Sequence, residues 1–361
     1  MPRHRGINVN GTAWDDGAPP VTEEELGWIA GWGLDFVRLV LSPQRLDDPG
    51  LDALDRLVDA AGRHGLHACL DFHEAPGYAI WAREPPAAGA DLFRDPAPRE
   101  RFLALWAALA ARYRGIPAAA LSFDLLNEPP VMADDTEGDL ERLFAHPHAG
   151  SASAVTTGAY EELMRAAVAA VRAHDPARAI VVEGTNMAQT PLPRAFYEEL
   201  GVVAGLHFYL PMTVTHYGAD HAAGMADGAP PPAWPSPAPS VTGDRARFGG
   251  EIARAFGMDS DAPWTRTRLE ESLAPWLALA DAGIPVHVGE CGVIRHTPHA
   301  VALAYLRDLL SVLAGHDVGF SLWALRDPDY GLLGSARRDA ALAPWHGTTL
   351  DRGLLAVLQG G

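Results

Sequence analysis

Two glutamates that close apolar runs are the side chains best suited to chemistry in this chain of 361 residues. Glu128 lies in LSFDLLNEPP, residues 121–130, and Glu290 ends PVHVGE, residues 285–290. A protonated carboxyl group and an ionised carboxylate can together cleave a glycosidic bond, because the first protonates the leaving oxygen and the second attacks the anomeric carbon. Cleavage with retention requires the two groups to lie about 5 to 5.5 Å apart. The pair therefore predicts a carbohydrate as the substrate.

Further polar and aromatic side chains end apolar runs where packing alone would favour valine or isoleucine. They are Arg38, His73, Asn127, Glu183, His207, Tyr209 and Trp323. His207 and Tyr209 are two residues apart, so strand alternation places both on one side of the sheet. Active sites of α/β barrels form where the C-terminal ends of the strands meet. We therefore expect this set to surround the two glutamates.

The neighbours predict opposite protonation states for the two carboxyl groups. Arg38 and Tyr209 would keep Glu290 ionised through charge and hydrogen bonding, whereas Glu128 has to hold its proton. Asn127, beside the acid, can hydrogen-bond a sugar hydroxyl group. Trp323 offers an apolar face against which the C–H surface of a sugar can pack.

The elements that must position these residues are eight apolar runs separated by helical segments. The expected strands are residues 6–10, 35–41, 67–73, 121–128, 179–184, 203–209, 285–290 and 319–325. Amphipathic helices are expected at 23–33, 51–65, 99–115 and 158–176, with Gly65, Gly115 and Pro176 as stop signals. Near-continuous apolar strands that alternate with helices indicate a parallel sheet covered by helices.

Eight such units predict a (β/α)8 TIM barrel, which we expect to form one catalytic domain over residues 1–361. Long loops follow the fourth and sixth strands, at 129–158 and 210–249, and the second is rich in proline, glycine and alanine. Because both follow strands, we expect them on the C-terminal face, the second as a wall of the binding cleft or as a mobile flap.

The ordered set of motifs resembles glycoside hydrolase family 5, the cellulase-like family within clan A of the glycoside hydrolases. Asn127-Glu128-Pro129 matches the Asn-Glu-Pro after strand four of that family, and Glu290 in VHVGECG matches the glutamate after strand seven. His207-Phe208-Tyr209 matches its His-x-Tyr after strand six. The family residues of strands two, three and eight are matched by Arg38, His73 and Trp323.

The resemblance implies a retaining β-glycosidase in which Glu128 is the acid/base and Glu290 the nucleophile. Cys291, directly after the nucleophile, departs from the phenylalanine, tryptophan or small residue expected there. The departure affects the expected substrate detail and leaves the mechanism unchanged.

Several other residues carry two alternative interpretations. Glu183 and Asn186 end a strand and either contact the sugar or cap a loop. Trp81, which follows His73 on one loop, is a candidate sugar platform, and ordinary packing is its alternative. Asp327 and Asp329 follow the last strand and either bind a terminal sugar or cap a turn.

Composition excludes several classes of function. A net charge of −18 argues against nucleic acid binding, which needs clustered positive charge. Two cysteines are too few for a disulfide framework or a cysteine-based zinc site, and the first expected strand ends in NVNG rather than in a His-x-His pair. We therefore expect no metal and no cofactor. No apolar stretch reaches the length of a membrane span.

The predicted function is hydrolysis of a β-glucan, a β-mannan or a related oligosaccharide or glycoside. The alternatives are a transglycosylase on the same scaffold and a non-catalytic carbohydrate-binding barrel. PGYAIW at 76–81 and the loop at 210–249 favour action at chain ends. The start of the chain lacks a run of signal-peptide length, which predicts a cytoplasmic location unless a leader has been removed. The sequence does not determine the oligomeric state.

Overall fold

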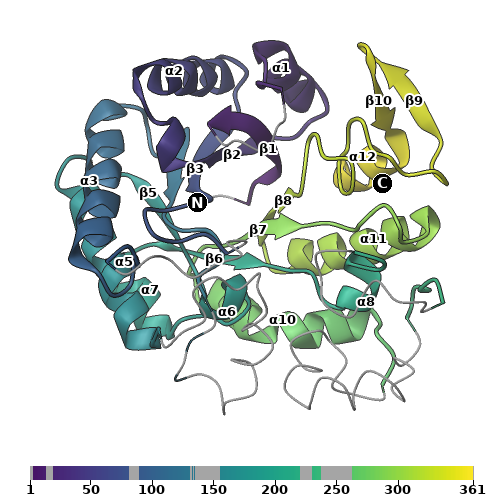
Figure 1. Ribbon diagram of the computed structural model, residues 1–361. Helices are drawn as coiled ribbons and strands as arrows, with labels where there is room; N and C mark the ends of the chain where they lie inside the picture. The colour runs from purple at the N-terminus through teal and green to yellow at the C-terminus, as the bar shows by residue number, and fades with distance from the viewer. Residues whose placement is uncertain are drawn as a thin grey trace.

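The computed structural model is a closed barrel of eight parallel strands in the order β1 to β8 (Figure 1). The strands are β1 (Arg5–Ala13), β2 (Phe36–Leu41), β3 (His67–Phe72), β4 (Leu121–Asp124), β5 (Ala179–Glu183), β6 (Val203–His207), β7 (Val286–Cys291) and β8 (Gly319–Leu322). The (β/α)8 fold expected from the sequence is confirmed. The structure describes residues 3–13, 19–80, 89–130, 132, 134, 155–219, 230–236 and 262–360.

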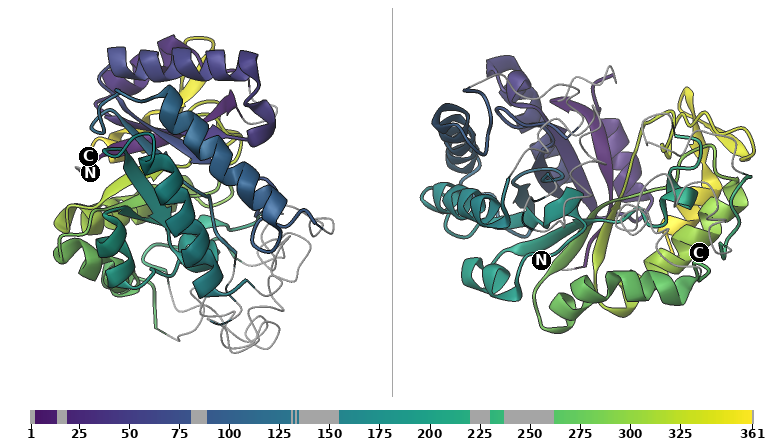
Figure 2. Two further views of the ribbon diagram at one scale, coloured as in Figure 1. Left: turned by 90° about the vertical axis from the view of Figure 1, so that its left-hand side faces the viewer. Right: turned by 60° about the horizontal axis from the view of Figure 1, so that its bottom comes forward.

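Helices surround the strands on the outside of the barrel, as the views of Figure 2 also show. They are α1 (Glu23–Gly31), α2 (Asp48–Arg63), α3 (Pro96–Arg112), α5 (Thr157–Arg172), α7 (Arg194–Leu200), α10 (Arg266–Asp281), α11 (His299–Gly315) and α12 (Arg352–Leu358), with short turns η1 (Pro43–Arg45), α6 (Thr185–Ala188) and α8 (Met212–Thr215). No helix among the described residues is long and apolar enough to cross a lipid bilayer.

Local sequence signals explain where the helices begin and end. Thr22 caps α1 through a capping box, in which its hydroxyl group accepts from the main chain of Glu25 and the Glu25 carboxylate accepts from Thr22 in return. Gly65 follows the end of α2 with a φ of +71°, a conformation that glycine adopts without strain. The four predicted helices correspond to α1, α2, α3 and α5.

Strand β4 ends earlier than the sequence predicts. It stops at Asp124 instead of Glu128. In a regular strand, residues two apart hydrogen-bond to the same neighbouring strand, and this alternation breaks after Asp124. The main-chain N–H of Leu125 donates to Val181 on β5, whereas that of Asn127 donates to Phe72 on β3. Glu128 therefore does not share strand alternation with Asp124, and its φ is +45°.

The C-terminal segment adds a hairpin and a helix that the sequence reading did not predict. Strands β9 (Leu342–Trp345) and β10 (Thr348–Asp351) pair antiparallel, and α12 follows directly. Figure 1 and the right view of Figure 2 both show this segment, in yellow, beside α11. Most of the predicted loops at 129–158 and 210–249 lies outside the described residues.

Trp106 on α3 connects the helix layer to the strands beneath the predicted acid. Its fully buried ring lies 4.3 Å from the ring of Phe72 and 5.1 Å from that of Phe123, centroid to centroid. Its indole N–H donates to the carbonyl oxygen of Leu125, at 3.1 Å, in the segment between β4 and Glu128. This residue therefore fixes the path of the chain that leads to the acid.

We predict that Trp106→Ala lowers the free energy of unfolding by about 3–5 kcal/mol, because it empties a large buried site and leaves the Leu125 carbonyl group without its donor. Denaturant-induced unfolding measures the change. Ala108→Ser, at an exposed position of the same helix, serves as control and should change the value by less than about 0.5 kcal/mol. Equal unfolding free energies for Trp106→Ala and the wild type would contradict the prediction.

Candidate active site

The C-terminal ends of the strands bring the predicted side chains to one place above the barrel interior. One carboxylate oxygen of Glu128, one of Glu290 and one ring nitrogen of His207 all lie within 4.8 Å of one another. His207 and Glu290 are register partners on the neighbouring strands β6 and β7. The two carboxyl groups, 162 positions apart in the sequence, therefore face each other across a few ångströms.

Glu290 is held by two donors, as the sequence predicts. Nη1 of Arg38 lies 2.9 Å from its Oε1, and the hydroxyl group of Tyr209 donates to its Oε2 at 3.0 Å. Burial alone would raise the pKa of this carboxyl group. The positive charges of His207 and Arg38 outweigh burial, so the pKa lies below its ordinary value of 4.5. Glu290 is therefore ionised at neutral pH.

Glu128 has a different environment. Burial raises the pKa of its carboxyl group above 4.5, against the hydrogen bond from His207, and the nearby negative charge of Glu290 raises it further. His207 Nδ1 lies 2.9 Å from Oε1 of Glu128. The main chain of this residue is also fixed, because its N–H donates to Glu183 at 2.7 Å and its carbonyl oxygen accepts from Tyr78. The environment of Glu128 therefore favours a protonated carboxyl group.

Arg38 is fully buried, and its guanidinium group is surrounded by several side chains at once. Its guanidinium nitrogens lie 2.9 to 3.1 Å from side-chain oxygens of Asn8, Asp71, Asp124, Asn127, Glu183 and Glu290. A buried guanidinium group has a high desolvation cost unless carboxylates and further acceptors surround it. Strands β1, β3, β4, β5 and β7 and the segment directly after β4 supply these acceptors across the barrel interior.

Glu183 lies beneath the two catalytic candidates and is 1% exposed. The sequence left it between a sugar contact and loop capping, and the structure places it against Arg38, His207 and the main chain of Glu128. Burial would raise the pKa of Glu183, but the charges of His207 and Arg38 outweigh it and lower the pKa to about 2.

His73, Trp323 and Asn127 also converge on the site. Nδ1 of His73 lies 2.7 Å from a carboxylate oxygen of Asp71, and its ring stacks on the ring of Trp323 at 5.2 Å and 9°. Oδ1 of Asn127 accepts a hydrogen bond from Arg38. The predicted contact of Asn127 with a sugar hydroxyl group would therefore use its amide nitrogen. His73 thereby supports the aromatic face that Trp323 offers.

Some site residues were missed, and others lie outside the described residues. Asn8, Asp71 and Asp124 bind Arg38 from β1, β3 and β4. Strand alternation is the signal that could have identified such residues, because side chains two positions apart point to the same face and Asp71 stands two positions before His73. The predicted platform Trp81 lies outside the described residues.

Three smaller questions left by the sequence are answered. Oδ1 of Asp327 accepts from the main chain of Asp329 and Tyr330, which is turn capping, and Asp329 pairs with Arg295 at 2.8 Å. Cys291 is a buried free thiol that is directed at the carbonyl oxygen of Ser321, and burial raises its pKa to about 12. The unusual residue after Glu290 is therefore an unreactive one.

The trio of Glu128, His207 and Glu290 has ligand types and spacing that a metal ion would accept. Its atoms already have partners in Arg38, Tyr209 and Glu183, and the positive charge of Arg38 offsets the charge of Glu290. The arrangement therefore suits proton transfer without requiring an added cation.

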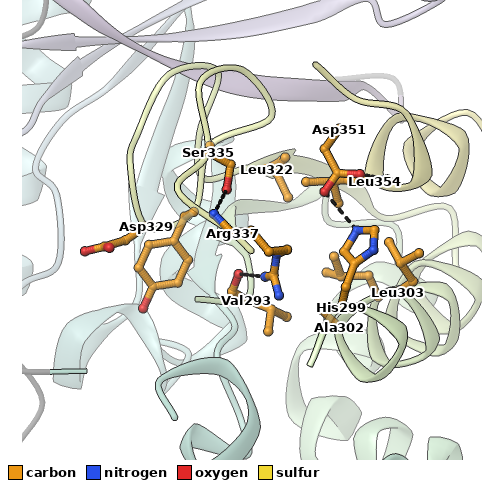
Figure 3. Close-up of a pocket in the computed structure, with 13 residues that line it drawn as sticks. Val293, His299, Ala302, Leu303, Leu322, Asp329, Ser335, Arg337, Asp351 and Leu354 are labelled. Carbon is orange, nitrogen blue, oxygen red and sulfur yellow. Dashed lines mark hydrogen bonds and ion pairs between the residues drawn. The ribbon is translucent and has the colours of Figure 1, made fainter. Parts of the chain in front are cut away.

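A separate small cavity lies between α11 and the C-terminal segment, and Arg337 lines it (Figure 3). The guanidinium group of Arg337 donates to the carbonyl oxygens of Val293 and Ile294 at 3.1 and 3.0 Å, and also to that of Thr297. These carbonyl groups belong to the chain directly after β7. The C-terminal segment thus supports the strand that carries Glu290.

A barrel with two facing carboxyl groups of opposite protonation at its C-terminal rim defines the class of glycoside hydrolases. Residues 3–329 match the family described as Cellulase (glycosyl hydrolase family 5). The chain belongs to this family, and it is an O-glycosyl hydrolase that acts on carbohydrate.

Relatives and solved structures agree with this assignment. Endoglucanase C from Acetivibrio thermocellus is 24% identical over 331 residues, which are 88% of this chain and 88% of that protein. Cellodextrinase A from Ruminococcus flavefaciens is 24% identical over 309 residues, 82% of this chain and 76% of that protein. A crystal structure described as a glycoside hydrolase has a TM-score of 0.80 at 26% identity and covers 99% of both chains.

We predict that Arg38→Met lowers the free energy of unfolding by about 3–5 kcal/mol, because it leaves buried carboxylates without their counter-charge. In the wild type the folded pKa values of Glu183 and Glu290 are depressed. Their contribution to stability is therefore present above about pH 4.5, their unfolded value, and is lost as the pH falls. The loss caused by Arg38→Met should therefore be larger at about pH 7 than at about pH 3, which lies below that unfolded value.

Arg112→Met is the matched control, because Arg112 also binds a carboxylate, that of Asp55 at 2.8 and 2.6 Å, but on the surface. It should cost only about 0 to 1 kcal/mol. Chemical unfolding at the two pH values measures both variants. An Arg38→Met protein that is as stable as Arg112→Met would show that the charge cluster is not held by Arg38.

Proposed function

We propose that the protein is a retaining β-glycosidase that cleaves β-linked glucose chains or related oligosaccharides, with Glu128 as acid/base and Glu290 as nucleophile. The observation that carries the proposal is the distance of at most 4.8 Å between a carboxylate oxygen of each residue. Retaining enzymes hold their carboxyl groups about 5 to 5.5 Å apart, whereas inverting enzymes leave about 6.5 to 9.5 Å for a water molecule.

The first step forms a covalent glycosyl-enzyme. A carboxylate oxygen of Glu290 attacks the anomeric carbon while the bond from that carbon to the glycosidic oxygen breaks. The electron pair of the broken bond goes to the glycosidic oxygen, which takes the proton of Glu128. Arg38 and Tyr209 hold Glu290 in place for the attack, since each binds one of its two oxygens.

The second step hydrolyses the intermediate and restores both carboxyl groups. Glu128, now ionised, takes a proton from a water molecule whose oxygen attacks the anomeric carbon, and the ester bond to Glu290 breaks with its electron pair returning to the carboxylate. Two inversions at one carbon give overall retention. The ring of Trp323 is stacked on His73 at the same rim. This position supports a role for Trp323 as the platform against which a sugar packs.

The pH dependence follows from the directions of the two pKa shifts. Glu290 must be ionised, so activity falls as the pH drops through its lowered pKa. Glu128 must be protonated before the first step, so activity falls as the pH rises through its raised pKa. The profile of kcat/KM should therefore be bell-shaped.

The names of the relatives support glucose-based chains as the substrate class, because one relative is an endoglucanase and another a cellodextrinase. Action at chain ends stays a prediction of the sequence. It rested on residues 76–81 and 210–249, of which 81, 220–229 and 237–249 lie outside the described residues. Experiments have to separate action at chain ends from internal cleavage.

We predict that Glu290→Ala lowers kcat on an aryl β-glucoside by roughly 10⁴-fold or more, because no covalent intermediate can form. Added azide should restore part of the turnover by attacking the anomeric carbon from the emptied side, which gives the α-glucosyl azide. Mass spectrometry and NMR of the product identify the azide and its anomeric configuration.

Glu128→Ala is the matched control, since there azide attacks the intact covalent intermediate and gives the β-glucosyl azide. Normal turnover by Glu290→Ala, or the same azide anomer from both variants, would refute the assigned roles.

We predict from the sequence that a reduced cello-oligosaccharide of five or six units loses only its terminal sugar or disaccharide at early times. The expected cause is a cleft closed at one end. Chromatography of the products by length measures this. Products of intermediate length from the first minutes would show internal cleavage instead, as the name Endoglucanase C describes for that relative.

A further inference from the structure

Both ring nitrogens of His207 face carboxylate oxygens. Nδ1 lies 2.9 Å from Oε1 of Glu128 in a hydrogen bond, and Nε2 lies 3.0 Å from Oε1 of Glu183 in an ion-pair contact whose angle is not that of a hydrogen bond. A neutral imidazole carries a single N–H group and could serve only one of these acceptors, whereas the imidazolium ion carries two. The side chain is 1% exposed, so water does not supply an alternative partner. The geometry therefore requires a second proton on this ring or on one of the carboxyl groups.

Negative charge surrounds His207 on several elements. The charged and titratable groups that face it are Arg38 on β2, Asp124 on β4, Glu128 after β4, Glu183 on β5 and Glu290 on β7. Burial would lower the pKa of His207, but Glu183 and Glu290 outweigh it and raise the pKa well above 6.5. The second proton therefore belongs on the ring.

The position of the ring is also fixed sterically. At Gly289 a Cβ atom would lie 3.1 Å from Nε2 of His207, so the absence of a side chain at this position leaves room for the ring. Glu183 in turn fixes Glu128, because its Oε2 accepts the main-chain N–H of Glu128 at 2.7 Å. Glu128 has a φ of +45°, which a residue other than glycine adopts only when its surroundings hold it there.

We propose that Glu183 is a positioning residue that keeps His207 doubly protonated and thereby confines the catalytic proton of Glu128 to Oε2. This inference rests on the proposed role of Glu128 as the acid. When Nδ1 of His207 carries a proton, Oε1 of Glu128 accepts its hydrogen bond, and the carbonyl oxygen of a carboxylic acid is a stronger acceptor than its hydroxyl oxygen. The acid proton then sits on Oε2, which no hydrogen bond from the described residues reaches.

The consequence is a directed acid. The Glu128 side chain is 22% exposed, in contrast to Glu183 and His207 at 1%, so a substrate can approach Glu128 but not the two residues behind it. Without the charge of Glu183, a neutral His207 could accept the proton of Glu128 at Nδ1. The proton would then point away from the glycosidic oxygen.

The test is Glu183→Gln, which keeps the shape of the side chain and removes its charge. Two substrates separate positioning from general damage. An unactivated cello-oligosaccharide needs the acid, whereas a dinitrophenyl glucoside has a leaving group that departs without a proton. General acid catalysis contributes about 10²- to 10⁴-fold, so we expect kcat on the oligosaccharide to fall by about 10-fold or more and kcat on the dinitrophenyl glucoside by less than about 3-fold.

The ring of His207 provides a second measurement that needs no turnover. In ¹⁵N NMR of the full-length wild type, both ring nitrogens should carry protons at about pH 7, and their signals are assigned by their loss in His207→Gln. In Glu183→Gln one of the two protons should leave at lower pH than in the wild type, because the neighbouring anion is gone. Glu183→Asp keeps the charge and should retain the doubly protonated ring.

Asp175→Asn is the matched control, because Asp175 is a buried carboxyl group that pairs with a buried arginine, Arg178, at 2.6 Å, ahead of β5 and with no contact to His207 or Glu128 among the described residues. The control should leave the ratio of the kcat values on the two substrates unchanged, and also the NMR signals of His207.

A singly protonated His207 in the wild type, or equal losses on both substrates in Glu183→Gln, would overturn the proposal. The proposed function fails separately, through the azide experiment on Glu290→Ala. If the two azide anomers appear as expected while the His207 signals in Glu183→Gln match the wild type, only the role of Glu183 is wrong.

Discussion

One buried guanidinium group, that of Arg38, determines how the interior of this barrel can be built. A positive charge without water has a cost of several kcal/mol unless acceptors surround it closely. Here the acceptors come from six other side chains, on β1, β3, β4, β5 and β7 or directly after β4. Because each of them has to point inward at the level of Arg38, the charge fixes the register of the polar layer. The layer then holds Glu290 in the place from which it can attack a sugar.

The unequal pKa shifts of Glu128 and Glu290 are a consequence of this layer. Glu290 touches Arg38 directly, whereas Glu128 is separated from it by Asn127 and Glu183. The same burial therefore leaves one carboxyl group ionised and raises the pKa of the other. His207 lies between them, 2.9 Å from Glu128 and 3.7 Å from Glu290, so its charge acts on both. Two chemically identical side chains thus acquire different roles from their neighbours alone.

Some of the residues that stabilise this barrel are different from the residues that line the candidate site. Apolar contacts such as those of Trp106 with Phe72 and Phe123 hold the helices to the outside of the strands. Main-chain carbonyl groups beyond the strand ends are fixed by long side chains, as Arg337 fixes the segment after β7 and Trp106 the segment after β4. The chain that carries each glutamate is therefore held from the outer side, and its carboxyl group remains free to face the substrate.

Much of this was readable in the sequence, because apolar runs with polar ends have a strict meaning in a parallel barrel. The eight strands, the four predicted helices and the meeting of Arg38, His207, Tyr209 and both glutamates agree with the structure. The departure of the chain from β4 at Asp124 was not readable. Strand alternation assumes a regular ladder, and here Leu125 and Asn127 bond to different neighbours.

The sequence by itself thus determined the fold, the family and the identity of the acidic pair, since these depend on residue types and their order along the chain. Only the tertiary structure decided which atom faces which. Glu183 illustrates the difference, because the sequence left it between a sugar contact and loop capping, whereas it lies against His207, Arg38 and the main chain of Glu128. Protonation states depend on distances of about 3 Å between groups far apart in sequence, and no local pattern encodes such distances.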